Sequence, residues 1–321
     1  MRILIAYIAV VLLWSITPLA IKWSGEGPGY LFGVSGRMVS GLLALALYCV
    51  IRGIRLPLDH LARLTYLAGA IQIYGSMVLT YWASQHLPSG WLSVIFGLTP
   101  LLTAPLAAYF LQEKSLTPRR LGSYFFGLGG LGLMFHSALQ FSPSATFGLL
   151  AILGAACFQS LSAVWIKKMN RGLSAVVQVT GSLCIAVPLY LLTWWTFDGV
   201  WPDVIPPRAL YAILFLGLIA TTGGFALYFY ILRELPAGRV ALINLLTPML
   251  SLYVGDLLNH ESIPVTVYGG TLLILTALIL YEWEGLVSLV HLLKPDRKPS
   301  QKRSRASRKR APTRKLRRRR Y

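Results

Sequence analysis

The strongest constraint on this chain is a succession of apolar segments, each long enough to cross a membrane. A transmembrane helix needs about 20 mostly apolar residues to span roughly 30 Å of hydrocarbon, and within lipid its backbone must satisfy its own hydrogen bonds. The composition, 55% hydrophobic and 13% charged, excludes an ordinary soluble domain. We therefore predict an all-α integral membrane protein with ten transmembrane helices, at residues 3–22, 29–51, 64–84, 90–111, 120–139, 147–167, 174–196, 209–232, 238–258 and 264–285.

The loops between these segments carry most of their positive charge on one side. If the N-terminus is cytoplasmic, 27 Lys and Arg residues fall on the cytoplasmic side and only Lys22 and Arg208 on the other, with the intramembrane Arg37 left out. An excess of Lys and Arg in short loops marks the cytoplasmic side. This distribution predicts a multi-pass protein of the cell membrane, the cytoplasmic membrane in bacteria, with both termini cytoplasmic.

The C-terminal segment differs from the rest of the chain. Residues 294–321 hold 15 Lys and Arg and one acid, Asp296, so they account for most of the net charge of +19. A segment this polar does not bury enough apolar surface to fold alone. We predict a disordered basic cytoplasmic tail over residues 291–321, which lies against anionic lipid. Nucleic acid would bind it through charge alone, without specificity.

The two halves of the chain repeat each other. An offset of 148 residues aligns 87–122 with 235–270 and gives ten identities in 36 positions. Each half holds five predicted spans, and an odd number places the second copy in the membrane upside down. We predict a 5+5 inverted-topology repeat, with one repeat at residues 1–140 and the other at 141–290. Inverted repeats build alternating-access carriers, whose substrate site lies near the midplane between the repeats.

Several of these features together resemble the drug/metabolite transporter superfamily, EamA type. The resemblance rests on the Leu-Pro-x-Gly sequence at 87–90 and 235–238, the Thr-Pro pairs at 99–100 and 247–248, and the arginine in the second span. It covers the chain up to residue 285 and leaves the basic tail uncovered. The resemblance implies an alternating-access carrier or exporter of small metabolites such as amino acids.

Arg37 is the one strong charge well inside a predicted span. An intramembrane arginine is a functional hypothesis by default, because it attracts a carboxylate, a phosphate or a dipole in a cavity. The alternative is a structural role, in which the side chain extends outward or binds backbone carbonyls between helices. Both interpretations stay open from the sequence.

Pro100 and Pro248 lie near the predicted midplane of their spans. A proline there frees the carbonyl four residues earlier, at Phe96 and Asn244, and leaves a helix kink. Asn244 adds a side-chain amide at the same depth. A kinked polar midplane suits both binding and movement in a carrier, although a purely structural kink fits the sequence equally well.

Aromatic and amide side chains elsewhere in the spans are further candidates for this site. Aromatic walls with a few polar groups suit amphipathic organic solutes. Each such residue taken alone is also typical of packing or of an interface belt. The predicted substrate-binding set is Trp14, Arg37, Gln72, Tyr74, Tyr81, Gln159, Tyr228 and Asn244.

Other chemistries find little support in the sequence. Residues 127–132 match GxGxxG but lie in an apolar span, where glycines allow helices to approach closely. The cysteines have no metal-ligand spacing and are expected to be small buried residues, so we expect no metal and no cofactor. No carboxylate falls at the predicted midplane, which disfavours a proton relay.

We therefore expect a transporter, not an enzyme, that moves small organic metabolites, amino-acid-like or amphipathic, by export or facilitated exchange. One alternative is a membrane tether or scaffold that acts through the basic tail. A membrane-embedded enzyme is a further alternative, but no nucleophile with an acid and a base falls at one depth. The sequence predicts no particular oligomeric state.

Overall fold

The computed structural model describes residues 2–112, 117–169, 172–224, 227, 230–231, 234–235, 237–283 and 287, with the backbone alone for 237–242. All regular secondary structure in these residues is helical. The helices are α1 (Arg2–Ser24), α2 (Tyr30–Ile51), α3 (His60–Ala70), η1 (Ile71–Ser76), α4 (Met77–Ser84), α5 (Ser89–Phe96), α6 (Thr99–Leu111), α7 (Pro118–Phe141), α8 (Pro143–Met169), α9 (Ala175–Phe197), α10 (Pro207–Leu214), η2 (Phe215–Gly223), α12 (Ala237–Asn259) and α13 (Val265–Tyr281).

Several of these helices fit a membrane by length and composition. Within the described residues, five stretches are long and apolar enough to cross one: Arg2–Ser24, Tyr30–Ile51, Ser89–Leu111, Pro143–Met169 and Ala175–Phe197. Two shorter apolar stretches are Pro207–Gly223 and Val265–Tyr281.

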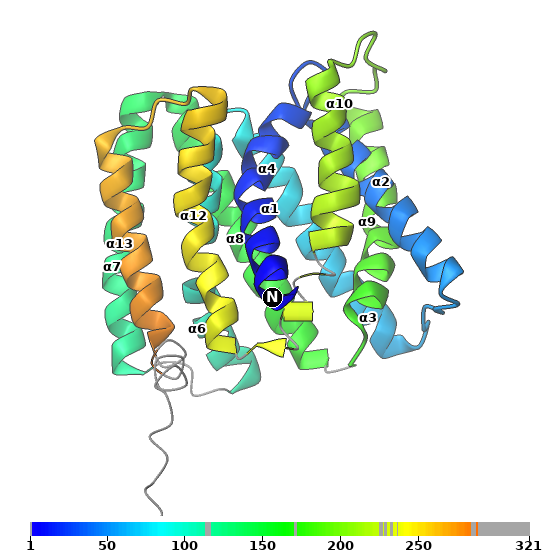
Figure 1. The fold of residues 1–321 in the computed structure, drawn as a ribbon, viewed down its shortest axis with the longest axis horizontal. Helices are drawn as coiled ribbons and strands as arrows, with labels where there is room; N and C mark the ends of the chain where they lie inside the picture. Colours follow the sequence, from blue (N-terminus) through cyan, green and yellow to red (C-terminus); the bar gives the residue numbers. More distant parts are fainter. Residues whose placement is uncertain are drawn as a thin grey trace, which may run out of the picture.

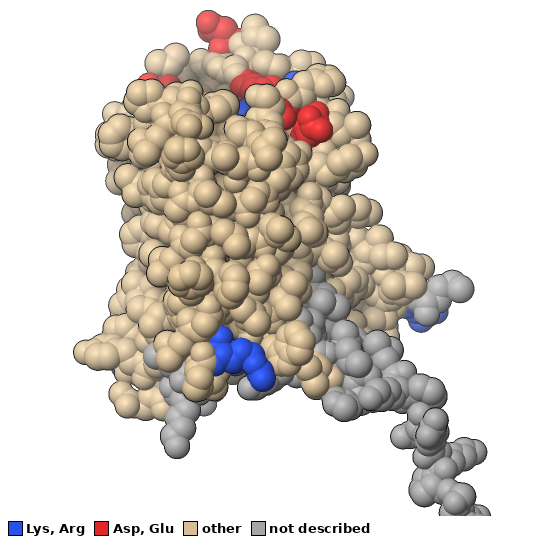
Figure 2. All heavy atoms as spheres, turned by 90° about the vertical axis from the view of Figure 1, so that its left-hand side faces the viewer, with Lys and Arg blue, Asp and Glu red and all other residues tan. Residues whose placement is uncertain are grey.

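The outer surface of the bundle is apolar over its middle. Phe125 is 78% exposed and Trp195 is 74% exposed, and Figure 2 shows a broad uncharged band between two charged ends. A continuous apolar surface of this size is typical of a membrane contact. The expectation of three buried cysteines is wrong for Cys157 and Cys184, which are exposed because they lie on outward faces of α8 and α9, whereas Cys49 is buried.

The two halves of the sequence share their cores. Figure 1 shows α1 near the centre of the bundle, with α7 and α13 side by side at one edge and α2, α9 and α10 toward the other. One core cluster joins α1, α2 and α4 to α9, α10 and η2. The second joins α5, α6 and α7 to α8, α12 and α13. Each cluster therefore combines residues from both sides of residue 140.

Glycines allow a close contact between α7 and α13. A Cβ atom added at Gly130 of α7 would lie 2.7 Å from the carbonyl oxygen of Gly270 in α13, and one at Gly270 would lie 3.0 Å from the carbonyl oxygen of Gly130. Only glycine permits so short a backbone approach. This contact is the packing role predicted for the glycines of residues 127–132.

Three interruptions break the regular α-helical geometry inside the bundle. The segments η1 and η2 are π-helical, with one extra residue in each hydrogen-bonded turn. Between α5 and α6 the helix breaks at Gly97 and Leu98, just before Pro100, and the Thr99 hydroxyl donates to the Phe96 carbonyl at 2.6 Å. In contrast, α12 runs through Pro248 as one helix.

Candidate functional site

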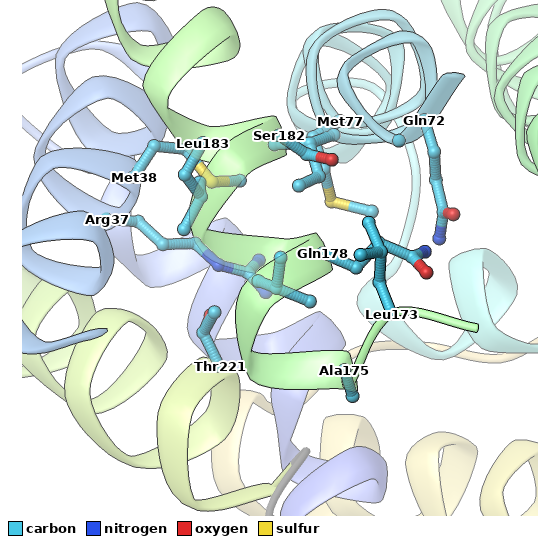
Figure 3. Close-up of a pocket in the computed structure, with 13 residues that line it drawn as sticks. Arg37, Met38, Gln72, Met77, Leu173, Ala175, Gln178, Ser182, Leu183 and Thr221 are labelled. Carbon is cyan, nitrogen blue, oxygen red and sulfur yellow. The ribbon is translucent and has the colours of Figure 1, made fainter. Parts of the chain in front are cut away.

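A cavity of about 240 Å³ lies between α2, α3, η1, α4, α9 and η2 (Figure 3). Leu173 and Ala175 on its wall lie at the start of α9. In Figure 1 this start of α9 is at the lower end of the bundle, and the N-terminus of α1 points toward the same end. Its walls are largely apolar, with a few polar groups that come from four different helices. The described lining residues are Arg37, Met38, Gly69, Gln72, Ile73, Met77, Leu173, Ala175, Gln178, Val179, Ser182, Leu183 and Thr221.

Arg37 is the charged group of this wall. It extends from α2 toward Thr221 and Gln178 (Figure 3). Its Nε and Nη1 atoms are buried, and neither has a hydrogen-bond partner among the described residues. None of the described lining residues is acidic. Buried polar groups usually have hydrogen-bond partners, so these two nitrogens leave hydrogen-bonding capacity of Arg37 unused within the described residues.

Amides and a hydroxyl add neutral polar groups around Arg37. Gln72 comes from η1 and Gln178 from α9. The Ser162 hydroxyl of α8 donates to the Ala68 carbonyl at 2.7 Å and also lies 3.5 Å from Oε1 of Gln72. The Ser182 hydroxyl is buried and has no partner in the described part of the chain. The described wall therefore offers both hydrogen-bond donors and hydrogen-bond acceptors, but its fixed charge, that of Arg37, is positive.

Both π-helical segments border the cavity. Gln72 and Ile73 belong to η1, and Thr221 belongs to η2. The Ile73 carbonyl accepts a hydrogen bond from the Tyr190 hydroxyl of α9, and the Thr221 hydroxyl donates to the Leu216 carbonyl at 2.7 Å. A π-turn shifts side chains relative to the α-helical register and is frequent at functional sites. Here the two wide turns set the register of Gln72 and Thr221.

Three tyrosines lie together next to the cavity. Tyr81 and Tyr190 belong to the same buried cluster as Met38, which follows Arg37 in α2, and Tyr74 packs against this cluster. The rings of Tyr74 and Tyr190 meet edge to face with centroids 5.0 Å apart, and the Tyr74 hydroxyl lies 2.5 Å from Oγ1 of Thr193. Tyr81 is fully buried, and its hydroxyl lacks a described partner. The structure thus gathers Arg37, Gln72, Tyr74 and Tyr81 of the predicted set in one region.

The other members of the predicted set do not line the described cavity. Trp14 lies beside η2, since a Cβ atom at Gly224 would be 3.6 Å from its indole nitrogen. Gln159 is half-buried in α8, and Asn244 is exposed on α12. Pro100 is half-buried in the first turn of α6 and Pro248 is buried within α12. Tyr228 falls outside the described residues.

Sequence reasoning missed four polar residues of this region, namely Gln178, Ser182, Tyr190 and Thr221. Gln178 gave a usable signal, because it is an amide in an apolar segment, as Gln72 and Gln159 are. The hydroxyl residues gave none, because serine, threonine and tyrosine occur throughout the apolar segments and only packing decides which of them face the cavity.

A second polar cluster, the Glu261 network, lies at the opposite end of the bundle. The side chain of Glu261 is 5% exposed and forms an ion pair with Lys22 of α1, with 3.2 Å between Oε1 and Nζ. Oε2 accepts from the backbone N–H and the hydroxyl of Ser89, at 2.7 Å and 2.9 Å. Oε1 also accepts from Nδ2 of Asn259 at 2.9 Å. Every oxygen of this buried carboxylate is therefore hydrogen-bonded.

The Glu261 network extends to α10. Oδ1 of Asn259 accepts from the Trp23 indole at 3.0 Å and from Arg208 at 3.1 Å. The Arg208 guanidinium lies over the Trp23 ring, 4.0 Å from its centroid, and 3.6 Å from a carboxylate oxygen of Glu26. The network thus ties α1, α5, α10 and the end of α12 together.

The volume of the cavity admits only a small molecule. Its size is below the roughly 300–1,000 Å³ typical of sites for drug-sized ligands. Across the described residues, no three His, Cys, Asp or Glu side chains come together as metal ligands do. The polar groups of the wall can orient a solute.

The family comparison agrees with this architecture. The model of the EamA-like transporter family matches residues 1–136 and again residues 146–283. The chain therefore belongs to the EamA-like transporter family, membrane proteins with a two-repeat structure. Membership implies a small-molecule substrate and a place within the membrane.

Individual relatives support the same assignment, and one solved structure shares the fold. The chain is 27% identical over 278 residues to the uncharacterized transporter YoaV of Bacillus subtilis, covering 85% of this chain and 94% of YoaV. It is 28% identical over 119 residues to a probable terminal-alkyne amino-acid exporter of Streptantibioticus cattleyicolor, covering 34% of this chain and 40% of the exporter. A protein crystal structure matches the fold with a TM-score of 0.61 and 20% identity, covering 89% of this chain and 99% of the other. These two relatives are named as a transporter and an exporter, not as enzymes.

Proposed function

We propose that this protein moves small organic metabolites, amino-acid-like or amphipathic, across the cell membrane by alternating access, as export or facilitated exchange. The observation that carries the proposal is the cavity around Arg37, where two buried guanidinium nitrogens without a partner among the described residues lie on an apolar wall that also carries amides and hydroxyls. A small set of polar groups on apolar walls is typical of small-molecule sites. In a transporter family, such a cavity inside the helical bundle is the natural substrate site.

The proposal places ten spans in the chain, five in residues 1–140 and five in the inverted residues 141–290. Two features support it. The alignment of residues 87–122 with 235–270 relates the halves, and each half carries a π-helical segment in its third predicted span, η1 in the first and η2 in the second. Both segments border the same cavity, as a substrate site between inverted repeats requires.

The orientation follows from charge. Figure 2 shows Asp and Glu gathered at one end of the molecule and Lys and Arg mainly at the other. The basic end is cytoplasmic by the positive-inside rule, so both termini are cytoplasmic in this proposal. The basic tail, 291–321, lies outside the described residues, and we propose that it rests on anionic lipid.

The Glu261 network and the Arg37 cavity then have different roles in the transport cycle. The Glu261 network closes the outer end, because it joins Lys22 and Ser89 of the first half to Asn259 and Glu261 of the second. The cavity approaches the cytoplasmic end at Leu173 and Ala175. We assign this conformation to the inward-facing state of the cycle.

The amino-acid-like part of the substrate class has support from one relative. The Streptantibioticus cattleyicolor protein is named as a probable exporter of a terminal-alkyne amino acid. A guanidinium in the cavity suits the carboxylate that every amino acid carries.

Counterflow in proteoliposomes tests the proposal. Purified protein is reconstituted, and exchange of labelled amino acids, nucleosides and amphipathic amines is followed with and without a pH gradient. We expect saturable exchange of at least one class that does not need the gradient, because no carboxylate lies at the predicted midplane. Empty liposomes are the control, and absence of exchange for all three classes would count against the carrier.

The tether alternative makes a separate prediction. If the basic tail were the active part, deletion of residues 294–321 would abolish function. A carrier keeps its exchange activity without the tail, because the cavity lies wholly within the helical bundle. Counterflow with the truncated protein therefore decides between the two.

A further inference from the structure

The cavity around Arg37 is electrostatically one-sided. Arg37 supplies a positive charge, and the described lining offers no carboxylate to balance it. Two acidic residues of the described chain, Glu26 and Glu261, form ion pairs with Arg208 and Lys22 in the Glu261 network instead. Burial strengthens the effect of an unbalanced charge, because the surroundings screen it less than water does. The site therefore favours an anion over a neutral or cationic solute.

The shape and the remaining walls narrow the class of anion. A planar guanidinium binds the two oxygens of a carboxylate through paired hydrogen bonds, whereas a dianion such as phosphate would find no second cation among the described lining residues. Met38, Met77 and Leu183 provide an apolar wall, and methionine adapts its shape to different apolar groups. A volume of about 240 Å³ limits the solute to a small one. These features suit a short monocarboxylate with an apolar chain.

The described lining of the Arg37 cavity has no carboxylate that could pair with the ammonium group of a solute. A zwitterionic amino acid bound through its carboxylate holds its ammonium within a few bonds of Arg37. The described groups that remain for it are the neutral oxygens of Gln72, Gln178, Ser182 and Thr221. These oxygens accept hydrogen bonds but carry no charge, so they offset the repulsion from the guanidinium only in part.

We propose that the Arg37 cavity is a monocarboxylate site that does not require an amino group, so that 2-oxo or 2-hydroxy acids bind at least as well as the amino acids of the same carbon skeleton. The inference rests on the proposed function and specifies its substrate class. Arg37 holds the carboxylate, Gln72 and Gln178 hold the polar group at carbon 2, and the methionine wall receives the chain.

The test compares three solutes that share an isobutyl group: leucine, 4-methyl-2-oxopentanoate and 3-methylbutylamine. Binding to the purified full-length protein is measured by titration calorimetry, and inorganic phosphate is the fourth probe. We expect the 2-oxo acid to bind as tightly as leucine or more tightly. The amine and phosphate should bind at least about tenfold more weakly, the loss that one charge-assisted hydrogen bond produces. Tighter binding of leucine, of the amine or of phosphate than of the 2-oxo acid would overturn the proposal.

Variants of Arg37 separate the effect of its charge on binding from an effect on the structure of the protein. Arg37→Gln should weaken binding of the 2-oxo acid by about tenfold or more and leave the amine unchanged or improved, because hydrogen bonds to charged groups are the stronger ones. Arg37→Lys keeps the charge and should recover part of the affinity. Arg52→Gln is the matched control, since Arg52 is exposed at the end of the same helix. Equal affinities in the wild type and Arg37→Gln, with both proteins monodisperse, would contradict the proposal.

Failure of this inference is distinguishable from failure of the transport proposal. If proteoliposomes exchange the amine and Arg37→Gln leaves that exchange unchanged, the protein is a carrier and the carboxylate assignment is wrong. If no solute is exchanged, the carrier proposal fails, while the binding series still decides whether the cavity is a carboxylate site.

Discussion

At the scale of single residues, two charged side chains inside the bundle have opposite surroundings. Glu261 has every carboxylate oxygen hydrogen-bonded, and its charge is paired with Lys22. Arg37 has two buried nitrogens without a described partner. A fully paired buried charge holds helices in place, whereas an unpaired one is costly unless a ligand completes it. The proposal of a structural role for Glu261 and a binding role for Arg37 rests on this difference.

The Glu261 network should contribute measurably to stability. Glu261→Gln keeps the size of the side chain but removes the charge that pairs with Lys22 and turns one acceptor into a donor facing Ser89. We expect a loss of about 1–3 kcal/mol, the usual cost of leaving buried hydrogen-bonding groups unsatisfied, because Lys22 is 27% exposed and stays partly solvated. The loss should appear as a lower thermal unfolding temperature in detergent. Asp256→Asn is the control, since Asp256 is exposed on the preceding helix. Equal unfolding temperatures for the two variants would show that the Glu261 network does not contribute to stability.

The sequence revealed residues whose type is rare in apolar segments. Arg37 and Gln72 could be predicted as candidates because a charge or an amide is conspicuous within a predicted span. Ser182 and Thr221 could not, because hydroxyl residues are common there and their role depends on which helices pack together. The burial of Glu261 was equally hidden, since its partners Lys22 and Ser89 lie more than 170 residues away along the chain. That the predicted set binds substrate remains a prediction.

At the scale of elements, the π-helical segments determine which of their side chains line the cavity. At Gly217 of η2, an added Cβ atom would overlap the Ser40 hydroxyl and lie 2.8 Å from the Arg37 carbonyl oxygen. The close contact between η2 and α2 therefore depends on glycine at this position. Because α2 carries Arg37, a shift of η2 alters the cavity directly.

Two glycines of the same segment give a matched pair of variants. Gly217→Ala should cost about 1–3 kcal/mol through overpacking and should also weaken solute binding. Gly223→Ala should be neutral or stabilise by up to about 1 kcal/mol through helix propensity, because no described atom lies within 4 Å of its added Cβ. Thermal unfolding and calorimetric titration measure both effects. Similar behaviour of the two variants would contradict the packing role of Gly217.

Helices as a class could be predicted from the apolar segments, but their interruptions could not. The predicted span 64–84 falls within the continuous helical stretch formed by α3, η1 and α4, and the predicted span 90–111 contains the break between α5 and α6. A proline marks the second of these interruptions in the sequence. The residues of η1 carry no comparable signal, because a π-turn results from the fit of a helix to its neighbours.

At the scale of the whole molecule, the two halves of the chain are joined rather than separate. Each core cluster draws on both halves, so neither half buries its apolar faces alone. In the proposed transport cycle, the Glu261 network opens and closes the outer end while the halves rock around the Arg37 cavity. Movement between the halves is therefore the step on which the transport mechanism depends.

A reversible cross-link across the outer end tests this movement most directly. An added Cβ atom at Gly255 of α12 would lie 2.9 Å from the Ser89 hydroxyl of α5 and 2.6 Å from Oε2 of Glu261, so cysteines at positions 89 and 255 come within disulfide reach once the Glu261 carboxylate shifts. The variant carries Ser89→Cys and Gly255→Cys with the three native cysteines replaced by alanine, and Gly255→Cys alone in the same background is the control. We predict that oxidation abolishes counterflow in the double variant, leaves solute binding intact, and is reversed by reduction. Undiminished counterflow in the fully cross-linked protein would contradict alternating access through this end.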